Sequence, residues 1–255
     1  MEFSLANMLS AVLVLGSRVS GVMLFAPFLS NVAIPPRIKI MLTVTLTAVL
    51  YPVFSSRVEV MPVGQWPLLL GTELLVGVAI GITTNLVFEA AQMAGQVLSV
   101  QMGYSLVTLL DPQTQADTTV MSVFMQTMAL LIFLGLDVHH WILRAMARSF
   151  DYLPPGSARP NAAFTAQVLH VGGSVLGIGV QIAAPVLVAT IVADVLLGLL
   201  GKASPQMPLL FLGPAVKALF GLVLMSSAIR YWPDLFGRLF ANSFGLMEQA
   251  LHLAR

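Results

Sequence analysis

Apolar residues occupy long stretches of the chain, and charged residues and prolines interrupt them at intervals. The stretches are long enough for helices, and the polar or proline-rich segments between them are typical of loops. The pattern predicts an all-α fold of integral-membrane type, built from helical hairpins with about six long apolar helices and an amphipathic tail. The expected helices cover residues 3–26, 37–49, 68–102, 120–150, 161–193 and 209–231, and the tail covers 234–255.

The third of these helices is too long for a simple membrane crossing. Residues 68–102 contain no proline, and at 1.5 Å per residue they would extend about 52 Å. A bilayer core requires only about 20 helical residues. We therefore expect this helix to tilt, to break or to project beyond the lipid.

Small and polar residues form a regular stripe along the same helix. They recur every three or four residues, so they share one helix face. Glycines let another backbone approach closely, and buried carboxylates and amides require partners. The stripe predicts a contact face toward neighbouring subunits or a conduit, and packing against another helix of the same chain is the alternative. Its members are Glu73, Gly77, Gly81, Asn85, Glu89, Gln92 and Gln96.

Composition narrows the class of protein. Hydrophobic residues make up 58% of the chain and charged residues 9%, whereas soluble domains carry about 25% charged residues. So few charges cannot cover the surface of a soluble globule of this size, and the apolar content excludes disorder. A net charge of +1 gives no electrostatic footprint for nucleic acid. We expect a chain that lies in lipid or is buried among other chains.

Four isolated charges lie within or beside the apolar stretches. Ionisable groups in such positions are usually paired and are candidates for functional sites. A short turn would make the last two helices antiparallel neighbours, and this predicts an ion pair between Asp194 and Lys217. A structural ion pair is favoured over proton transport, because no graded series of carboxylates is present. The buried-charge candidates are Arg18, Asp194, Lys202 and Lys217.

No catalytic constellation can be assembled from the sequence. His139 and His140 suggest a metal, but adjacent residues point to different faces of a helix and no third ligand is obvious. The chain has no nucleophile elbow, no phosphate-binding glycine loop followed by lysine, and no cysteine. We therefore predict no enzymatic activity, no catalytic residue, no cofactor and no metal site.

Several segments together resemble the FliR family, the export-gate protein of bacterial flagella, whose counterpart in virulence injectisomes is of the SctT type. No single motif is specific, but their order and spacing over nearly the whole chain are. Two positions depart from the family pattern: Pro208 replaces a common asparagine, and Pro214 replaces a bulky apolar residue. The matching residues are Arg18-Val19-Ser20-Gly21; Ile34-Pro35-Pro36-Arg37-Ile38-Lys39; Glu73, Gly77 and Gly81; Gln92, Gly95, Gln96, Gln101 and Gly103; Asp111-Pro112; Leu134 with His139-His140; Gln181, Pro185, Asp194 and Gly198; Ser204-Pro205-Gln206-Met207; and Gly213 to Lys217 with Gly221.

The resemblance implies a non-enzymatic subunit of a protein-conducting gate that passes unfolded flagellar proteins. The implied partners are FliP-like and FliQ-like gate subunits, an FlhB-like switch protein and an FlhA-like exporter. The implied location is the bacterial inner membrane, within the flagellar basal body. Residues 1–255 would form a single helical domain, with N-terminal helices in 1–150, a C-terminal hairpin in 160–231 and the tail after it.

The loop from Gly103 to Thr119 resembles the segment that plugs the closed pore in this family. A loop of about 17 residues without its own secondary structure is uncommon unless it is functional, so the residues themselves also point to this segment. We expect it to help close the pore. The plug candidates are Gly103, Tyr104, Leu106, Leu109, Leu110, Asp111 and Pro112.

Three alternatives to a flagellar gate subunit stay open at this point. The SctT-type subunit of an injectisome shares these motifs. A small-molecule transporter would show inverted repeats with broken helices at matching positions, and Pro185 in the fifth helix has no matching break in the third. A plain membrane scaffold would differ only in having no passage.

Overall fold

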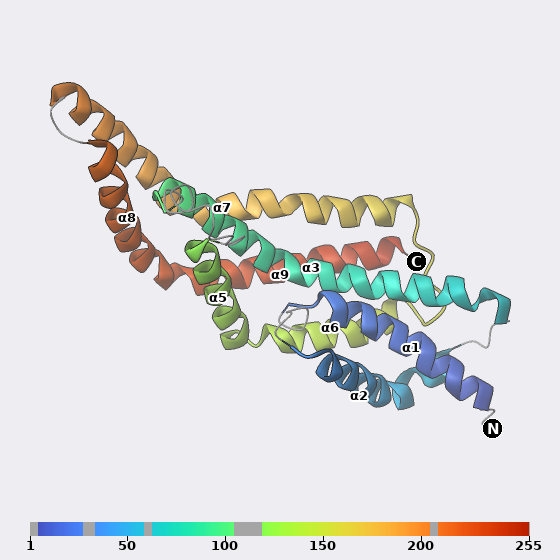
Figure 1. The fold of residues 1–255 in the computed structure, drawn as a ribbon. Helices are drawn as coiled ribbons and strands as arrows, with labels where there is room; N and C mark the ends of the chain where they lie inside the picture. Colours follow the sequence, from blue (N-terminus) through green and yellow to red (C-terminus); the bar gives the residue numbers. More distant parts are fainter. Residues whose placement is uncertain (1–4, 28–33, 59–62, 105–118, 205–208, 255) are drawn as a thin grey trace. The chain divides into compact units, whose positions relative to one another are not determined.

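The computed structural model describes residues 5–27, 34–58, 63–104, 119–204 and 209–254. Within these residues the secondary structure is helical and no strand occurs, so the predicted all-α class is confirmed (Figure 1). Short 3₁₀ turns lie at Ser55–Arg57, Val63–Gln65 and Ile229–Tyr231. The helices are α1 (Leu5–Phe25), α2 (Pro36–Phe54), α3 (Trp66–Gln101), α5 (Val120–Gly135), α6 (Val138–Tyr152), α7 (Ala162–Ala203), α8 (Leu209–Ala228) and α9 (Trp232–Leu253).

Length and apolar composition allow most of these helices to cross a membrane. Among the described residues, five helical segments meet that test, and the number rises to six if α5 and α6 together form one broken span. α3 is a single uninterrupted helix over Trp66–Gln101, as the absence of proline predicts. The fold is therefore an all-α fold of membrane-protein type.

Three of the expected helices have different limits in the structure. The fifth was expected over 161–193, but α7 continues to Ala203. α2 was expected to end at Val49, but it continues through Pro52 to Phe54, although the proline removes one main-chain hydrogen bond. The expected helix 120–150 is two helices, because the chain breaks at Asp137, which has a left-handed φ of 54°. Aspartate tolerates this conformation better than most residues do.

The chain divides into two compact units, and each combines segments that are distant in sequence. Unit 1 consists of Met1–Leu86, Asp137–Gly173 and Phe240–Arg255, and unit 2 consists of Val87–Leu136 and Ser174–Leu239. Both units draw on the N-terminal and the C-terminal parts of the chain.

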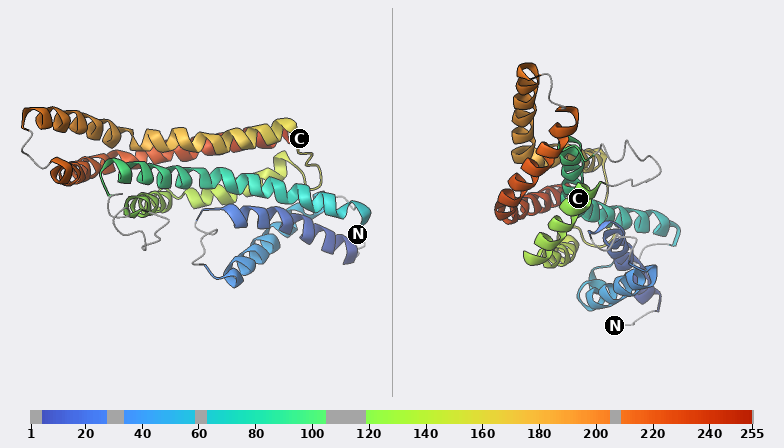
Figure 2. Two further views of the ribbon diagram at one scale, coloured as in Figure 1. Left: turned by 45° about the horizontal axis from the view of Figure 1, so that its top comes forward. Right: turned by 60° about the vertical axis from the view of Figure 1, so that its left-hand side comes forward.

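Unit 1 is built around α1. Leu15, Val19 and Val22 of this helix are fully buried, with α2 beside α1 in Figures 1 and 2. The rings of Phe54 and Phe150 pack with their centroids 5.0 Å apart. α1 thus supplies the central apolar face of this unit.

Unit 2 has a core of its own and an open hairpin. Phe88 and Phe133 meet edge to face with their ring centroids 5.4 Å apart. The second part of α7 and α8 run antiparallel as a hairpin (Figure 2). Large apolar side chains of this hairpin, such as Leu199 and Leu219, are exposed in the chain.

Candidate functional site

Glycines allow α1 and α3 to cross at very short range within unit 1. A Cβ atom on Gly21 would lie 2.5 Å from the carbonyl oxygen of Leu74, and one on Gly81 would lie 2.7 Å from a side chain of α1. A Cβ atom on Gly77 would overlap the carbonyl oxygen of Arg18. Helices approach this closely only where side chains are absent. The N-terminal part of the stripe therefore packs against α1 of the same chain, as the intramolecular alternative predicts.

A buried ion pair lies beside this crossing. Nε of Arg18 donates to Oε2 of Glu73 at 2.6 Å, and both side chains are completely buried. Nη1 of Arg18 donates to the carbonyl oxygens of Ser149 at 3.0 Å and Leu153 at 2.9 Å. Oε1 of Glu73 accepts the N–H of Gly156 at 2.8 Å. The pair thus joins α1, α3, the end of α6 and the connection that follows α6.

The surroundings of Arg18 indicate a structural role. Its guanidinium lies over the ring of Phe150, 4.4 Å from the ring centroid, where a cation is attracted to the aromatic face. Nη2 of Arg18 makes no hydrogen bond to the described residues. Removing one partner of a buried pair leaves an uncompensated charge, which costs about 3–5 kcal/mol.

The remainder of the stripe is more accessible. Asn85 and Gln92 are half-buried, whereas Glu89 and Gln96 are exposed. Gly95, between the last two glutamines, faces the start of α5, where an added Cβ would lie 2.5 Å from a main-chain oxygen. Gly77, Gly81 and Gly95 of α3 therefore pack inside the chain, while two of its polar side chains reach the surface.

The C-terminal end of α3 is attached to α8 within unit 2. Gly103 has a positive φ of 83°, and a Cβ atom there would lie 2.9 Å from Cβ of Pro214. Met102 is fully buried, and its side chain fills the space beside Gly221, where an added Cβ would lie 2.6 Å from Cε of the methionine. Pro214, one of the two departures from the family pattern, thus forms part of the contact that fixes the start of the loop.

An accessible cluster of charged side chains lies near the C-terminal end of α3. Nζ of Lys217 lies 2.9 Å from Oδ1 of Asp194, which is the ion pair that the antiparallel hairpin predicts. Nε2 of Gln101 donates to Oδ2 of Asp194 at 3.0 Å. The side chains of Asp194 and Lys217 are 44% and 17% exposed, and Lys202 is exposed as well. Of the four buried-charge candidates, only Arg18 is fully buried within the chain.

Both ends of the plug candidate segment are held in unit 2. Gly103 and Tyr104 are described, and the second end begins at Thr119, the N-cap of α5, whose Oγ1 accepts the N–H of Ser122 at 3.2 Å. The helix that follows lies against Gly95. The remaining plug candidates, Leu106, Leu109, Leu110, Asp111 and Pro112, lie outside the described residues.

The two adjacent histidines differ from the sequence expectation. Their rings stack with centroids 4.1 Å apart, because both lie at the very start of α6, directly after the break. Oδ1 of Asp137 lies 3.8 Å from Nε2 of His139 and 3.6 Å from Nδ1 of His140. The imidazoles therefore do not face apart, and a third possible ligand is present, although 71% of the Asp137 side chain is exposed and remains hydrated.

The partners that hold the site together were not predictable from the sequence. Arg18 and Glu73 were singled out separately, but Ser149, Leu153 and Gly156 contribute main-chain atoms, which have no signature in a sequence. Ser149 and Leu153, which accept hydrogen bonds from Arg18, lie 131 and 135 residues from it along the chain. The only available signal was that a buried carboxylate and a buried guanidinium each require a partner.

Comparisons with known proteins agree on one family. Residues 9–243 match the family described as "Bacterial export proteins, family 1". The chain is similar to the flagellar biosynthetic protein FliR of Escherichia coli K12, with 27% identity over 92% of this chain and 90% of the relative. It is 29% identical to the same-named protein of Pectobacterium carotovorum, with the same coverage of 92% and 90%. It is 26% identical to that of Bacillus subtilis over 87% of each chain.

Proposed function

This chain belongs to the bacterial export proteins of family 1, and on that premise we propose that it is a structural subunit of the flagellar type III export gate in the bacterial inner membrane. It carries out no chemistry. It assembles with FliP-like and FliQ-like subunits, alongside an FlhB-like switch protein and an FlhA-like exporter, to pass unfolded flagellar proteins.

The observation that carries this proposal is a match over nearly the whole chain to relatives named for flagellar biosynthesis. Two features of the fold support it. Several helices are long and apolar enough to cross a membrane. The hairpin of α7 and α8 leaves large apolar side chains exposed, and such surfaces are typical of sites that bind another protein or lipid.

We further propose that the segment from Gly103 to Thr119 helps to close the pore. The contacts of Gly103 with Pro214 and of Gly95 with the start of α5 hold its two ends in the same unit. A segment held at both ends occupies a limited volume, because fixing the ends restricts the positions that the residues between them can reach. Such a segment can obstruct a passage without being displaced along it.

Co-assembly tests the proposed function. The full chain is to be co-expressed with FliP-like and FliQ-like subunits, purified through a tag on one of the partners, and imaged. We expect this chain in the purified particle and loss of flagellar protein export when its gene is deleted. Its absence from the particle, or normal export in the deletion strain, would contradict the proposal.

A pair of glycine variants tests the role of the loop. Gly103→Ala forces an alanine into a left-handed conformation at the start of the loop, at a cost of about 1–2 kcal/mol. Gly156→Ala is the matched control, because Gly156 also has a positive φ, of 90°, but belongs to unit 1 and to a different connection of the chain. We expect only Gly103→Ala to increase ion leakage through the assembled gate in proteoliposomes.

Deletion of residues within 105–118 should increase leakage further than Gly103→Ala. Leakage that stays at the wild-type level in both loop variants, in gates that assemble normally, would refute the plug assignment while leaving the gate assignment intact.

A further inference from the structure

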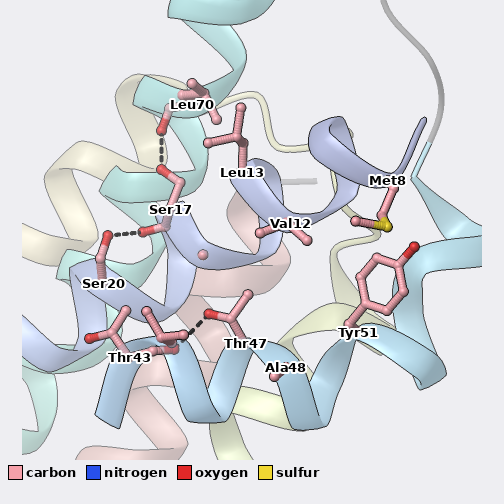
Figure 3. Close-up of a pocket in the computed structure, with 12 residues that line it drawn as sticks. Met8, Val12, Leu13, Ser17, Ser20, Thr43, Thr47, Ala48, Tyr51 and Leu70 are labelled. Atoms are coloured by element: carbon pink, nitrogen blue, oxygen red, sulfur yellow. Dashed lines mark hydrogen bonds between the residues drawn. The ribbon is translucent and has the colours of Figure 1, made fainter. Parts of the chain in front are cut away.

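α1 and α2 enclose an apolar groove in unit 1 that the proposed function does not explain. Its volume is 630 Å³. Figure 3 shows Val12 and Leu13 of α1 on one side and Ala48 and Tyr51 of α2 on the other, with Leu70 of α3 beside Leu13. Lining residues such as Leu13 are substantially exposed. Nothing within the described residues fills this groove.

The serine and threonine hydroxyl groups in the groove are already engaged. Ser17 donates to the carbonyl oxygen of Leu70 at 2.7 Å, and Thr47 donates to that of Thr43 at 2.7 Å, as the dashed lines in Figure 3 show. Ser20 and Thr43 donate to main-chain oxygens in the same way. A hydroxyl that is satisfied inside the chain does not demand a polar ligand. The groove is therefore suited to hydrocarbon.

A second cavity extends the groove toward the N-terminal end of α2. It has a volume of 230 Å³, shares Ser20, Thr43 and Val44 with the first cavity, and reaches Lys39. From Tyr51 to Lys39 the path follows α2 for about 18 Å at 1.5 Å per residue. One leaflet of a bilayer has a hydrocarbon depth of about 15 Å, half of the full core. The groove thus has the length of a lipid's acyl chains.

The end of the groove is positively charged. Lys39 lines it, and Arg37 is exposed two residues away. No carboxylate lies in the first turn of α2, and among the described residues no acidic group forms an ion pair with either cation. Cations are unfavourable at a helix N-terminus, where the main-chain dipole is also positive. An anion at this end would relieve both effects.

We propose that the groove binds an anionic phospholipid of the surrounding membrane, with its acyl chains between α1 and α2 and its phosphate at Lys39 and Arg37. A partner helix fits less well. An apolar helix would leave Lys39 and Arg37 without a counter-charge, because no carboxylate pairs with either cation among the described residues.

Native mass spectrometry of the purified full chain tests the headgroup assignment. The chain in detergent micelles is to be titrated with phosphatidylglycerol and, separately, with phosphatidylcholine of the same acyl composition. We expect one tightly retained phosphatidylglycerol and weaker retention of phosphatidylcholine. Lys39→Gln should weaken phosphatidylglycerol binding by about fivefold. Arg230→Gln removes one exposed cation elsewhere in the chain and should leave this binding unchanged.

A second pair of variants tests the groove. Ala48→Trp fills the groove, whereas Val49→Trp places the same side chain at an adjacent exposed position that does not line it. Only Ala48→Trp should displace the lipid. Melting temperatures of the four variants establish that each is folded.

Three outcomes would overturn the lipid proposal. Equal retention of the two lipids would refute the headgroup assignment. Equal lipid binding by the two tryptophan variants would place the lipid elsewhere. Full photo-crosslinking of position 48 to a partner chain in the assembled gate, with no retained lipid, would show that a protein fills the groove. None of these outcomes depends on export activity, so the proposed gate function stands or fails separately.

Discussion

α3 and α7 are two long apolar helices of the same chain, but they bury different fractions of their residues within it. In an apolar stretch of 18 residues within α3, 67% of the residues are buried within the chain, whereas in the corresponding stretch of α7 only 22% are buried. α3 carries glycines that let α1 approach and a glutamate that pairs with Arg18. Around Gly172, Gly173, Gly177 and Gly198 of α7, an added Cβ atom would meet nothing within 4 Å.

The charges follow the same division. Arg18 and Glu73 on α1 and α3 are completely buried, and main-chain groups complete their hydrogen bonds. Asp194 and Lys217 on α7 and α8 form a pair that solvent still reaches. The difference shows that the chain itself satisfies the charges of α1 and α3, while the hairpin of α7 and α8 retains surface for contacts outside it.

The largest expected effect is the loss of the buried pair. Glu73→Gln leaves the charge of Arg18 uncompensated, and we expect a loss of about 3–5 kcal/mol in the free energy of unfolding. Thermal and denaturant unfolding of the purified full chain, followed by circular dichroism, measures this loss. A melting temperature equal to that of the wild type would show that the pair does not secure the crossing of α1 and α3.

Two further variants define the origin of that effect. Asp151→Asn removes an exposed pair of unit 1, in which Arg57 and Asp151 have side chains 47% and 54% exposed. This control should cost less than about 1 kcal/mol. The double variant Arg18→Met/Glu73→Leu should recover part of the lost stability, because apolar side chains of similar volume often replace a buried pair without loss.

The next effect in size comes from the glycine contacts. Gly77→Ala places a methyl group against the main chain of α1, and overpacking of this kind costs about 1–3 kcal/mol. Gly71→Ala is the matched control on the same helix, since an added Cβ there meets nothing within 4 Å. That control should be neutral or stabilising by up to about 1 kcal/mol. Unfolding of the two variants under identical conditions gives the comparison.

Larger side chains at these positions extend the test to the gate. Gly77→Leu and Gly81→Leu should prevent recovery of the assembled complex, because the leucine side chain prevents α1 from packing against α3. An intact complex from either leucine variant would mean that the tight crossing is not needed for assembly.

The sequence predicts the helices of this chain well, since each one needs only a long apolar stretch between prolines or charges. α3 and α8 begin within two residues of the expected positions. The break at Asp137 was not predictable, because Leu134 to Val138 contains no proline and the backbone conformation of a single aspartate leaves no pattern. Pro52 had the opposite effect, since a proline indicates a helix end but α2 continues through it. Tertiary packing here outweighs the lost hydrogen bond.

The candidate site was predictable only in part. Periodicity identified Gly77 and Gly81 as contact positions, but it could not decide between α1 of the same chain and a neighbouring subunit, because either helix would require the same small residues. The pairing of Asp194 with Lys217 followed from the antiparallel turn. The pairing of Arg18 with Glu73 did not, because α2 and a loop separate these two residues in the sequence.

The smallest expected effect concerns the accessible pair. Asp194→Asn removes the ion pair with Lys217, but solvent compensates both groups, so the free energy of unfolding of the isolated chain should fall by no more than about 1 kcal/mol. If this hairpin lies against partner chains, the same pair is drier in the gate and its loss is more costly there. We therefore expect co-purification with the FliP-like and FliQ-like subunits to fall more steeply than the stability of the isolated chain. Equal effects of Asp194→Asn and Glu73→Gln on the isolated chain would remove the distinction between the two helices.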